Sequence, residues 1–376
     1  MPNQSTHNCE SCIHLSTRIC SLRNEEIDFP HFTTCRNWNA DIVTPLGVKY
    51  SLVSEVTNKV VSYVSLPYYQ GWRADTFRQQ LNDSYVVIVN NDLPQLSFKN
   101  SAEYLDFCKK ELYKKKNYIL GAIIGDMIGS VFEFNNYKST DFPLFQSKTT
   151  FTDDSVLTLA TMVVALHKLD YVNTYQAYGR KYTNRGYGGT FLYWIYMDEP
   201  EPYLSFGNGA AMRVSPVGWA YNTIDEVLRQ AKRSAEVSHN HPEGIKGAQA
   251  TASAVFLART GKSKPEIKEF IEVMFGYDLN RTIAQIRPGY SFDVTCQGSV
   301  PEAIIAFLES TDYESTIRLS VSLGGDSDTI ACIAGGIAEA FYQEIPEYII
   351  DKALQLLPKE FINLIGAFSN KYRISE

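Results

Sequence analysis

The 376-residue sequence lacks the features that mark membrane proteins and most nucleic-acid-binding proteins. No apolar run approaches the roughly 18 uninterrupted residues that a membrane span needs, and no basic start leads into an apolar segment at the N-terminus. Positive charge is in deficit, because 35 lysines and arginines stand against 42 acidic residues and leave a net charge of −7. We therefore expect a cytoplasmic protein with no membrane segment and no general binding to nucleic acid.

The sequence also lacks a recognisable side-chain nucleophile. It contains no G-x-S-x-G motif, and Cys296 and Cys332 stand alone, without a base assigned to either. Disulfides do not organise the chain, because four of the seven cysteines fall within residues 9–35 and the others are scattered. If the protein is a hydrolase, we expect an activated water to replace the nucleophilic side chain.

The first 40 residues form a Cys-rich segment of their own, with the spacing C-x2-C-x7-C-x14-C. Four soft ligands in a segment too small and polar to build a core predict a structural Zn²⁺ site of Cys9, Cys12, Cys20 and Cys35. Because the spacing is irregular, an iron–sulfur centre and free thiols remain as alternatives.

The pattern of apolar and polar residues differs between two further regions of the chain. Residues 41–116 contain β-branched and aromatic runs such as VKYSLVSEV and SYVVIVNN, then the helical pattern SAEYLDFCKKELYKKK, which together predict a small α+β region. From 117 to 376, apolar residues recur at helical spacing, so the fold class is mainly α with an all-α body. Within the body, helices are expected at 154–169, 223–237, 243–260, 264–274, 300–309, 313–321, 328–342 and 347–356.

The body begins with YILGAIIGDMIGSVFEF, which carries Gly121, Gly125 and Gly129 four residues apart. This spacing places the three glycines on one helix face, where a neighbouring element can approach closely. Glu133 follows the glycines, either as an ordinary surface glutamate or as one acid of a site.

Two helix starts each combine two acids with a threonine. They are Thr152, Asp153 and Asp154 in FTDDSVLTLA, and Asp326, Asp328 and Thr329 in LGGDSDTIA. Acids and threonine are common N-caps, which is the structural alternative. A cap uses one side chain, however, and no lysine or arginine lies near either motif to neutralise the surplus charge.

A metal ion is the simplest partner for this surplus charge. The available ligands are carboxylates and hydroxyls, which favour Mg²⁺, Mn²⁺ or Ca²⁺ over zinc. Two acidic clusters suit two ions, and paired ions roughly 3.5 to 4 Å apart can activate a water while holding the oxygens of a substrate. We therefore expect hydrolysis.

Two further segments supply polar groups. SFGNGAAMRVSPVGW, at residues 205–219, is a glycine loop whose N–H groups could hold phosphate oxygens, although it matches neither the P-loop nor the dinucleotide fingerprint and could be a simple turn. SHNHPEGIKGA supplies His239 and His241, which could cap a helix or contact a polar ligand.

Taken in order, GAIIGDMIGSVFEF, FTDDSVLTLA, GNGAAMRVSPVGW, SHNHPEGIKGA, CQGSVPEAI and LGGDSDTIA resemble the ADP-ribosylglycohydrolase family, typified by dinitrogenase reductase-activating glycohydrolase, over about residues 118–350. The resemblance implies a compact all-α fold with two Mg²⁺ ions, or Mn²⁺ in their place. It also implies hydrolysis of the bond between the anomeric carbon of ADP-ribose and an acceptor, most familiarly a protein arginine. The partners would be an ADP-ribosylated protein or other acceptor and the product ADP-ribose.

The resemblance also implies roles for individual residues. Metal binding falls to Thr152, Asp153, Asp154, Asp326, Asp328 and Thr329, and catalysis to Glu133, Asp153 and Asp326. Substrate binding falls to Gly207, Asn208, Gly209, Ala210, Ala211, Met212 and His239, with Val300 facing the adenine.

Residues 1–117 have no counterpart in the family pattern, and they leave two other functions open. In the first, the N-terminal region docks on a partner such as an ADP-ribosylating toxin, and the metal site is secondary. In the second, the same metal pair hydrolyses another ribosyl or phosphate ester. The intact set of acids favours the ADP-ribosyl hydrolase over both.

Overall fold

The computed structural model describes residues 118–373 and, within the first 117 residues, only the backbone of six strands. Contacts between Cα atoms divide the chain into two compact units, residues 1–117 and 118–376. Cys9, Cys12 and Cys35 lie outside the described residues, as does the side chain of Cys20, so the zinc site stays a prediction. The helix predicted at 101–116 also lies outside them.

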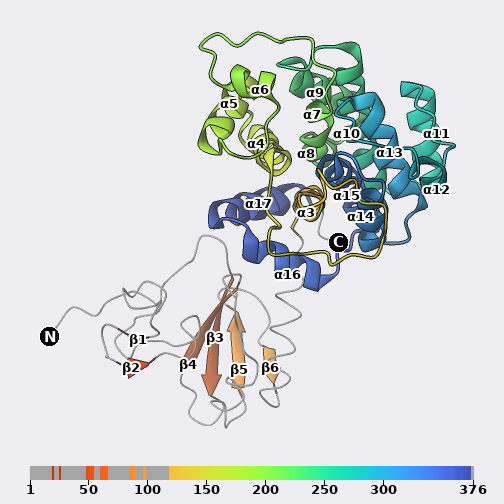
Figure 1. Cartoon of the computed structure of the whole chain (residues 1–376). Coiled ribbons are helices and arrows are strands. Elements are labelled where there is room, and N and C mark those ends of the chain that lie inside the picture. The colour runs from red at the N-terminus through yellow and green to blue at the C-terminus, as the bar shows by residue number, and fades with distance from the viewer. Residues whose placement is uncertain are drawn as a thin grey trace. The chain divides into compact units, whose positions relative to one another are not determined.

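The described strands of the first unit form two antiparallel groups (Figure 1). β1 (Ile19–Cys20) pairs with β2 (Glu25–Glu26). A second sheet has the order β4-β3-β5-β6, made of β3 (Val48–Ser54), β4 (Val60–Leu66), β5 (Tyr85–Val89) and β6 (Leu96–Phe98). β3 and β5 coincide with the two β-branched runs that predict strands.

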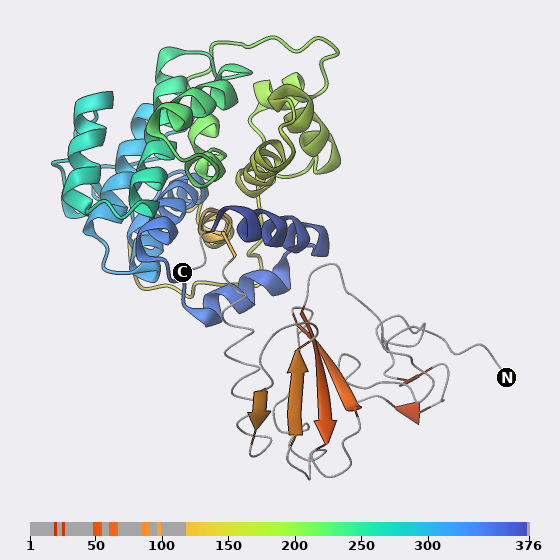
Figure 2. The ribbon, with the colours of Figure 1, turned by 180° about the vertical axis from the view of Figure 1, so that it is seen from behind.

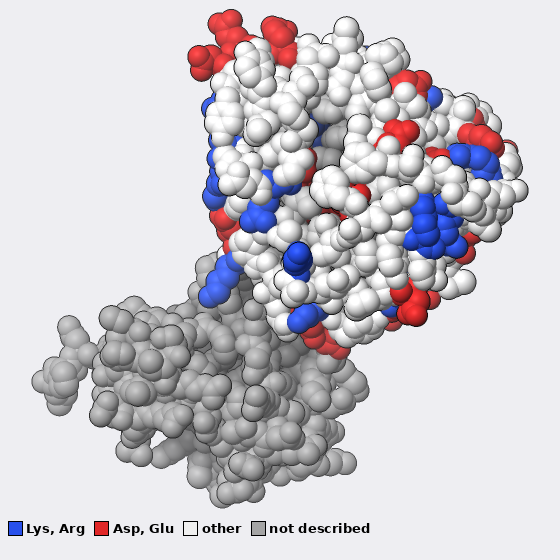
Figure 3. All heavy atoms as spheres, viewed as in Figure 1, with Lys and Arg blue, Asp and Glu red and all other residues white. Residues whose placement is uncertain are grey.

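Residues 118–373 contain helices and no β-strand, which confirms the predicted all-α body. The helices are α3 (Gly121–Gly129), α4 (Asp153–His167), α5 (Tyr171–Lys181), α6 (Gly189–Ile195), α7 (Gly209–Met212), α8 (Ser215–Ala220), α9 (Ile224–Glu236), α10 (Pro242–Arg259), α11 (Lys264–Phe275), α12 (Ile283–Ile286), α13 (Cys296–Glu309), α14 (Tyr313–Ser322), α15 (Ser327–Tyr342), α16 (Glu347–Leu356) and α17 (Lys359–Tyr372). Among the described residues, none of these helices combines the length and the apolar character that crossing a membrane requires. On the face shown in Figure 3, basic and acidic residues of the body form small scattered groups among uncharged atoms.

Each helix predicted in the body is present, and α13 begins four residues earlier than expected. Its start is fixed by Thr295, whose side chain accepts a hydrogen bond from the backbone N–H of Gly298.

Helices α3 and α15 pack side by side near the centre of the body, as the two opposite views in Figures 1 and 2 show. The three glycines of α3 face the backbone of α15. A Cβ atom built on Gly125 would lie 2.0 Å from the carbonyl oxygen of Ala331, and one on Gly129 would lie 2.5 Å from that of Ser327. The two backbones therefore touch, and this contact places the first turn of α15 beside the C-terminal half of α3.

Gly125→Ala is expected to destabilise the body by more than the roughly 1 to 3 kcal/mol typical of overpacking, because the added methyl meets backbone that cannot rotate away. Gly366→Ala in α17 is the matched control, since its Cβ would lie 3.4 Å from the Tyr118 ring, an ordinary contact. There the change should be neutral or stabilise the helix by up to about 1 kcal/mol. Thermal and denaturant unfolding of both variants decides the matter, and equal stability would disprove the close contact.

A buried acid also caps the N-terminus of α3. Glu339 of α15 accepts hydrogen bonds from the backbone N–H groups of Leu120 (3.0 Å) and Gly121 (2.6 Å). Arg373, beyond α17, pairs with Glu339 at 2.8 Å and donates to the carbonyl oxygen of Tyr118. Helices from the start and the end of the body are thus joined at one buried ion pair.

Candidate metal centre and active site

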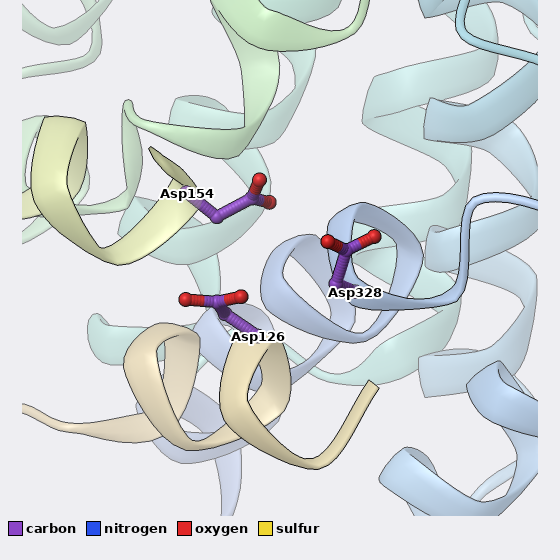
Figure 4. A group of neighbouring side chains, drawn as sticks. All are labelled: Asp126, Asp154 and Asp328. Carbon is purple, nitrogen blue, oxygen red and sulfur yellow. The ribbon is translucent and has the colours of Figure 1, made fainter. Parts of the chain in front are cut away.

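Carboxylates from three helices meet at the centre of the body (Figure 4). Asp126 comes from α3, Asp154 from the first turn of α4 and Asp328 from the first turn of α15. All three side chains are buried, and one oxygen of each lies within 4.8 Å of the others. Glu133, Asp326 and Asp328 form a second such group, so Asp328 belongs to both.

The two helix starts use their polar residues differently. Thr152 is an N-cap in the ordinary sense, because its side chain accepts a hydrogen bond from the backbone N–H of Asp154. Asp326 occupies the N-cap position of α15 but makes no capping hydrogen bond. Its Oδ2 accepts a 2.6 Å hydrogen bond from Nδ2 of Asn208 instead. Capping thus accounts for the threonine and leaves the acids available for another role.

Asp126, which the sequence analysis does not assign to the site, holds the start of α4 in place. Oδ1 accepts a 2.6 Å hydrogen bond from the hydroxyl of Thr152. Oδ2 accepts from the backbone N–H groups of Thr152 and Ser155 and from the Ser155 hydroxyl. With its oxygens engaged in this way, Asp126 acts as a support for the threonine and acids of α4.

Ionising these neighbouring buried carboxyl groups costs free energy, because their negative charges repel one another and are shielded from water. Burial, reinforced by the charges of Asp126 and Asp153, raises the pKa of Asp154 well above the usual range. Burial and the charges of Asp326 and Asp154 have the same effect on the pKa of Asp328. The pKa of Glu133 rises to about 7 through burial and the charges of Asp326 and Asp126. Burial raises the pKa of Asp126 to about 6 against the opposing effect of its hydrogen bonds.

The donor set fits a hard cation. All the convergent atoms are carboxylate or hydroxyl oxygens, and Oδ1 of Asp154 is buried with no hydrogen-bond partner among the described residues. The hydroxyl of Thr329 lies beside the other oxygen of Asp154, at 3.4 Å. A divalent cation would satisfy the unpaired oxygen and offset the mutual repulsion of the acids.

We expect the metal-free protein to lose stability as the pH rises. The carboxyls of Asp126 and Glu133 have pKa values of about 6 and 7 in the folded chain, above the ordinary value of about 4. The folded chain therefore binds more protons than the unfolded chain between about pH 4 and pH 7, and its stability falls as the pH rises through that window. In chelator, the melting temperature should be several degrees lower at pH 8 than at pH 6, and excess Mg²⁺ should remove most of the difference. An equal melting temperature at both pH values in chelator would contradict the repulsion.

The acid cluster opens on a cavity of about 420 Å³. Of the residues predicted for the site, the cavity lining includes Glu133, Asp153, Asp154, Gly207, Asn208, Gly209, Met212, His239, Asp326, Asp328 and Thr329. Thr152 lies behind the lining, hydrogen-bonded to Asp126. The side chains of Ala210, Ala211 and Val300 are fully buried and do not line the cavity.

Asp153 and His241 lie in different surroundings from the acids and the histidine with which the sequence groups them. Asp153 is half-buried in the cavity lining and belongs to neither of the two acid groups. His241 is the N-cap of α10, where its Nδ1 accepts a 3.1 Å hydrogen bond from the backbone N–H of Glu243. The capping alternative therefore holds for His241, whereas His239 faces the cavity.

The cavity has two further sides that the sequence analysis does not predict. One is the segment RGYGGT, which contributes Gly186, Gly188, Gly189 and Thr190. Repeated glycines ahead of a short helix were the available signal. The other side includes Phe292, which is half exposed and stacks on Phe134 with 5.9 Å between ring centroids.

Comparison with known proteins assigns this arrangement to a family. The family model described as ADP-ribosylglycohydrolase matches residues 112–373, well over half of the chain. This chain belongs to the ADP-ribosylglycohydrolase family. The family predicted from the motifs is thereby confirmed, and the match starts slightly before the residues that carry the resemblance.

Several relatives agree with this family. The ADP-ribosylhydrolase ARH3 of Mus musculus is 27% identical, over 63% of this chain and 86% of the relative. ARH3 of Homo sapiens is 26% identical, over 63% and 88%. A solved chain titled ADP-ribosylglycohydrolase-related protein complex has a TM-score of 0.54 at 23% identity, and the match covers 69% of this chain and 98% of that one. The likeness to the solved chain indicates that residues of this chain adopt the same fold. Membership of the family supports hydrolysis of an ADP-ribosylated substrate.

Proposed function

We propose that this chain is a Mg²⁺-dependent hydrolase that releases ADP-ribose from an ADP-ribosylated protein side chain. The observation that supports this proposal is a buried cluster of acids opening on the same cavity as a glycine loop. The cavity volume of about 420 Å³ lies in the range of small-molecule sites. The acids can bind the metal ions of a metal-assisted hydrolysis, and the N–H groups of the glycine loop can donate hydrogen bonds to the phosphate oxygens of a nucleotide.

The oxygens that would hold two Mg²⁺ ions come from both helix starts. They belong to Thr152, Asp153, Asp154, Asp326, Asp328 and Thr329. When bound, Mg²⁺ supplies polarisation of a water and of the ribose hydroxyls. Asn208 keeps Oδ2 of Asp326 in place through their hydrogen bond.

Glu133 is the residue we assign to proton transfer. It lines the cavity, is half-buried and has a pKa raised to about 7, close to the pH at which a general base works best. Its carboxylate accepts a proton from the water whose oxygen bonds to the anomeric carbon as the bond between that carbon and the acceptor breaks. The resulting carboxylic acid then donates this proton to the departing acceptor. Asp153, also half-buried in the lining, supplies negative charge near the positive charge that develops on the ribose ring.

The proposed acceptor is an arginine side chain, as the family resemblance implies. Glu133 and Asp153 place carboxyl oxygens on the cavity wall, and these oxygens suit the N–H groups of a guanidinium.

Release of free ADP-ribose tests the proposal directly. The full chain is incubated with arginine-linked, serine-linked and thymidine-linked ADP-ribose, each in Mg²⁺ and in chelator. We expect release from the arginine-linked substrate in Mg²⁺ only. Release from another substrate alone would reject the arginine acceptor and keep the hydrolase, whereas full activity in chelator would reject the metal-dependent mechanism.

A further inference from the structure

A fully buried arginine belongs to the cavity lining, next to the glycine loop in sequence. Arg213 follows α7, and its guanidinium lies over the ring of Tyr175, 4.5 Å from the centroid. Among the described residues, its hydrogen bonds all come from Nη2, which donates to the carbonyl oxygen of Ser234 at 2.7 Å and to Oγ of Ser238 at 3.1 Å. The arginine therefore reaches a hydroxyl and a carbonyl but no carboxylate.

The hydroxyl of Ser238 connects this arginine to His239. Ser238 is fully buried, and its Oγ lies 2.8 Å from Nδ1 of His239. A guanidinium can only donate, so Oγ accepts from Arg213 and keeps its own hydrogen to give away. Among the described residues, Nδ1 of His239 is the remaining partner for that hydrogen. Reversing this bond would leave the buried hydroxyl hydrogen of Ser238 without an acceptor.

The other ring nitrogen of His239 faces the cavity. Nε2 has no hydrogen-bond partner among the described residues, and a Cβ atom built on Gly209 or Gly207 would lie 3.1 or 3.5 Å from it. Both glycines line the cavity. The absence of side chains at these two positions leaves room for a ligand atom to reach Nε2.

We infer that Arg213 and Ser238 are positioning residues, which hold His239 as the tautomer with hydrogen on Nε2 and so make it a hydrogen-bond donor to an oxygen of ADP-ribose. This inference rests on the proposed function for the identity of the ligand. Burial, together with the charge of Arg213, lowers the pKa of His239 well below its usual value, so the ring is neutral at pH 7. His239 thus recognises an acceptor atom and takes no part in moving protons.

The tautomer can be read without any substrate. Long-range ¹H–¹⁵N spectra of the ¹⁵N-labelled full chain distinguish the two neutral tautomers, and the signals missing in His239→Gln identify His239. We expect hydrogen on Nε2 in the wild type and a shift toward hydrogen on Nδ1 in Ser238→Ala. Because Arg213 is fully buried and its replacement could unfold the body, Ser238→Ala carries the test.

A double-mutant cycle separates positioning from general structural damage. We expect Ser238→Ala to weaken ADP-ribose binding in Mg²⁺ by about 5- to 20-fold, the value of one hydrogen bond, with kcat changed less than about twofold. A glutamine at 239 carries an N–H near the position of Nε2 and has no tautomer to fix. Ser238→Ala should therefore cost less than about twofold when added to His239→Gln. His241→Ala is the control, since it changes the neighbouring capping histidine and should leave binding unchanged.

Hydrogen on Nδ1 in the wild type overturns the inference. An equal loss of affinity from Ser238→Ala in both backgrounds overturns it as well, because that result indicates a structural role. If the wild type neither binds nor releases ADP-ribose, the proposed function and the ligand assignment fail, and the spectra still decide whether Arg213 and Ser238 set the tautomer.

Discussion

Asp328→Asn is expected to abolish turnover while leaving the body folded. Asp328 is the acid shared by both groups of possible metal ligands, so its replacement weakens both. Loss of the several kcal/mol that bound metal contributes to the transition state corresponds to a fall of at least about a thousandfold in kcat. The same change removes one charge from a repelling cluster, so in chelator the variant should melt at or above the wild-type temperature.

Rate assays, calorimetric Mg²⁺ titration and thermal melting test this expectation together. Asp170→Asn is the matched control, because Asp170 is an exposed acid at the N-cap of α5 and asparagine caps equally well. The control should keep its rate and its Mg²⁺ affinity. An unchanged rate in Asp328→Asn would reject the metal centre, and a large fall in Asp170→Asn would reject the specificity of the effect.

Asp126→Asn is expected to lower Mg²⁺ affinity by about 10- to 100-fold, although Asp126 lies behind the ligands. An amide oxygen can replace Oδ2 and keep the hydrogen bonds from Ser155 and from the backbone of Thr152. The amide NH₂ then occupies the position of Oδ1 and donates to the Thr152 hydroxyl, which at present donates to Asp126. That hydroxyl must turn its hydrogen toward the acids, where it repels a cation.

Asp126→Ala should instead unfold the body more easily, because it leaves buried N–H groups of Thr152 and Ser155 without acceptors. Each unpaired group costs about 1 to 3 kcal/mol. Comparing the two variants separates metal tuning from stability: asparagine should mainly change the Mg²⁺ titration, and alanine the unfolding midpoint. If asparagine leaves the titration unchanged, Asp126 is only a structural residue.

The sequence is informative about the acids because they are in excess of what a cap needs. Asp154, Asp326 and Asp328 come after turns at helix starts, and their surplus charge is visible without a structure. Asp126 is different, since a lone acid within a glycine-rich apolar helix looks like an interruption. Its partners, Thr152 and Ser155, lie more than 25 residues away, and only the fold brings them together.

Most of the helices that the sequence did not predict share physical reasons, and α17 is the exception, since its 14 residues are long enough to show a helical period. α5 is rich in tyrosine and polar residues, and α6 spans only seven residues, so neither shows a clear apolar period. α7, α8 and α12 span six residues or fewer, which is too short for a period of 3.6 to show. The RGYGGT segment of the cavity wall was not predicted, because its glycines have no side chains that indicate a site. Their role is visible only once the structure places a cavity beside them.

The order in which the chain is synthesised has a consequence for α3. This helix emerges first in the body, yet its glycine face packs on α15 and its N-terminal N–H groups are capped by Glu339, 218 residues later. At the roughly 5 to 20 residues per second of translation, α3 waits on the order of 10 to 40 s for these partners. Throughout that interval the glycine face of α3 has no native surface to bury against, although α4 is already available to Asp126, which makes the nascent body a candidate for chaperone protection. A chain released before residue 327 would lack Asp328 as well, and so it could neither bury α3 nor complete the acid cluster.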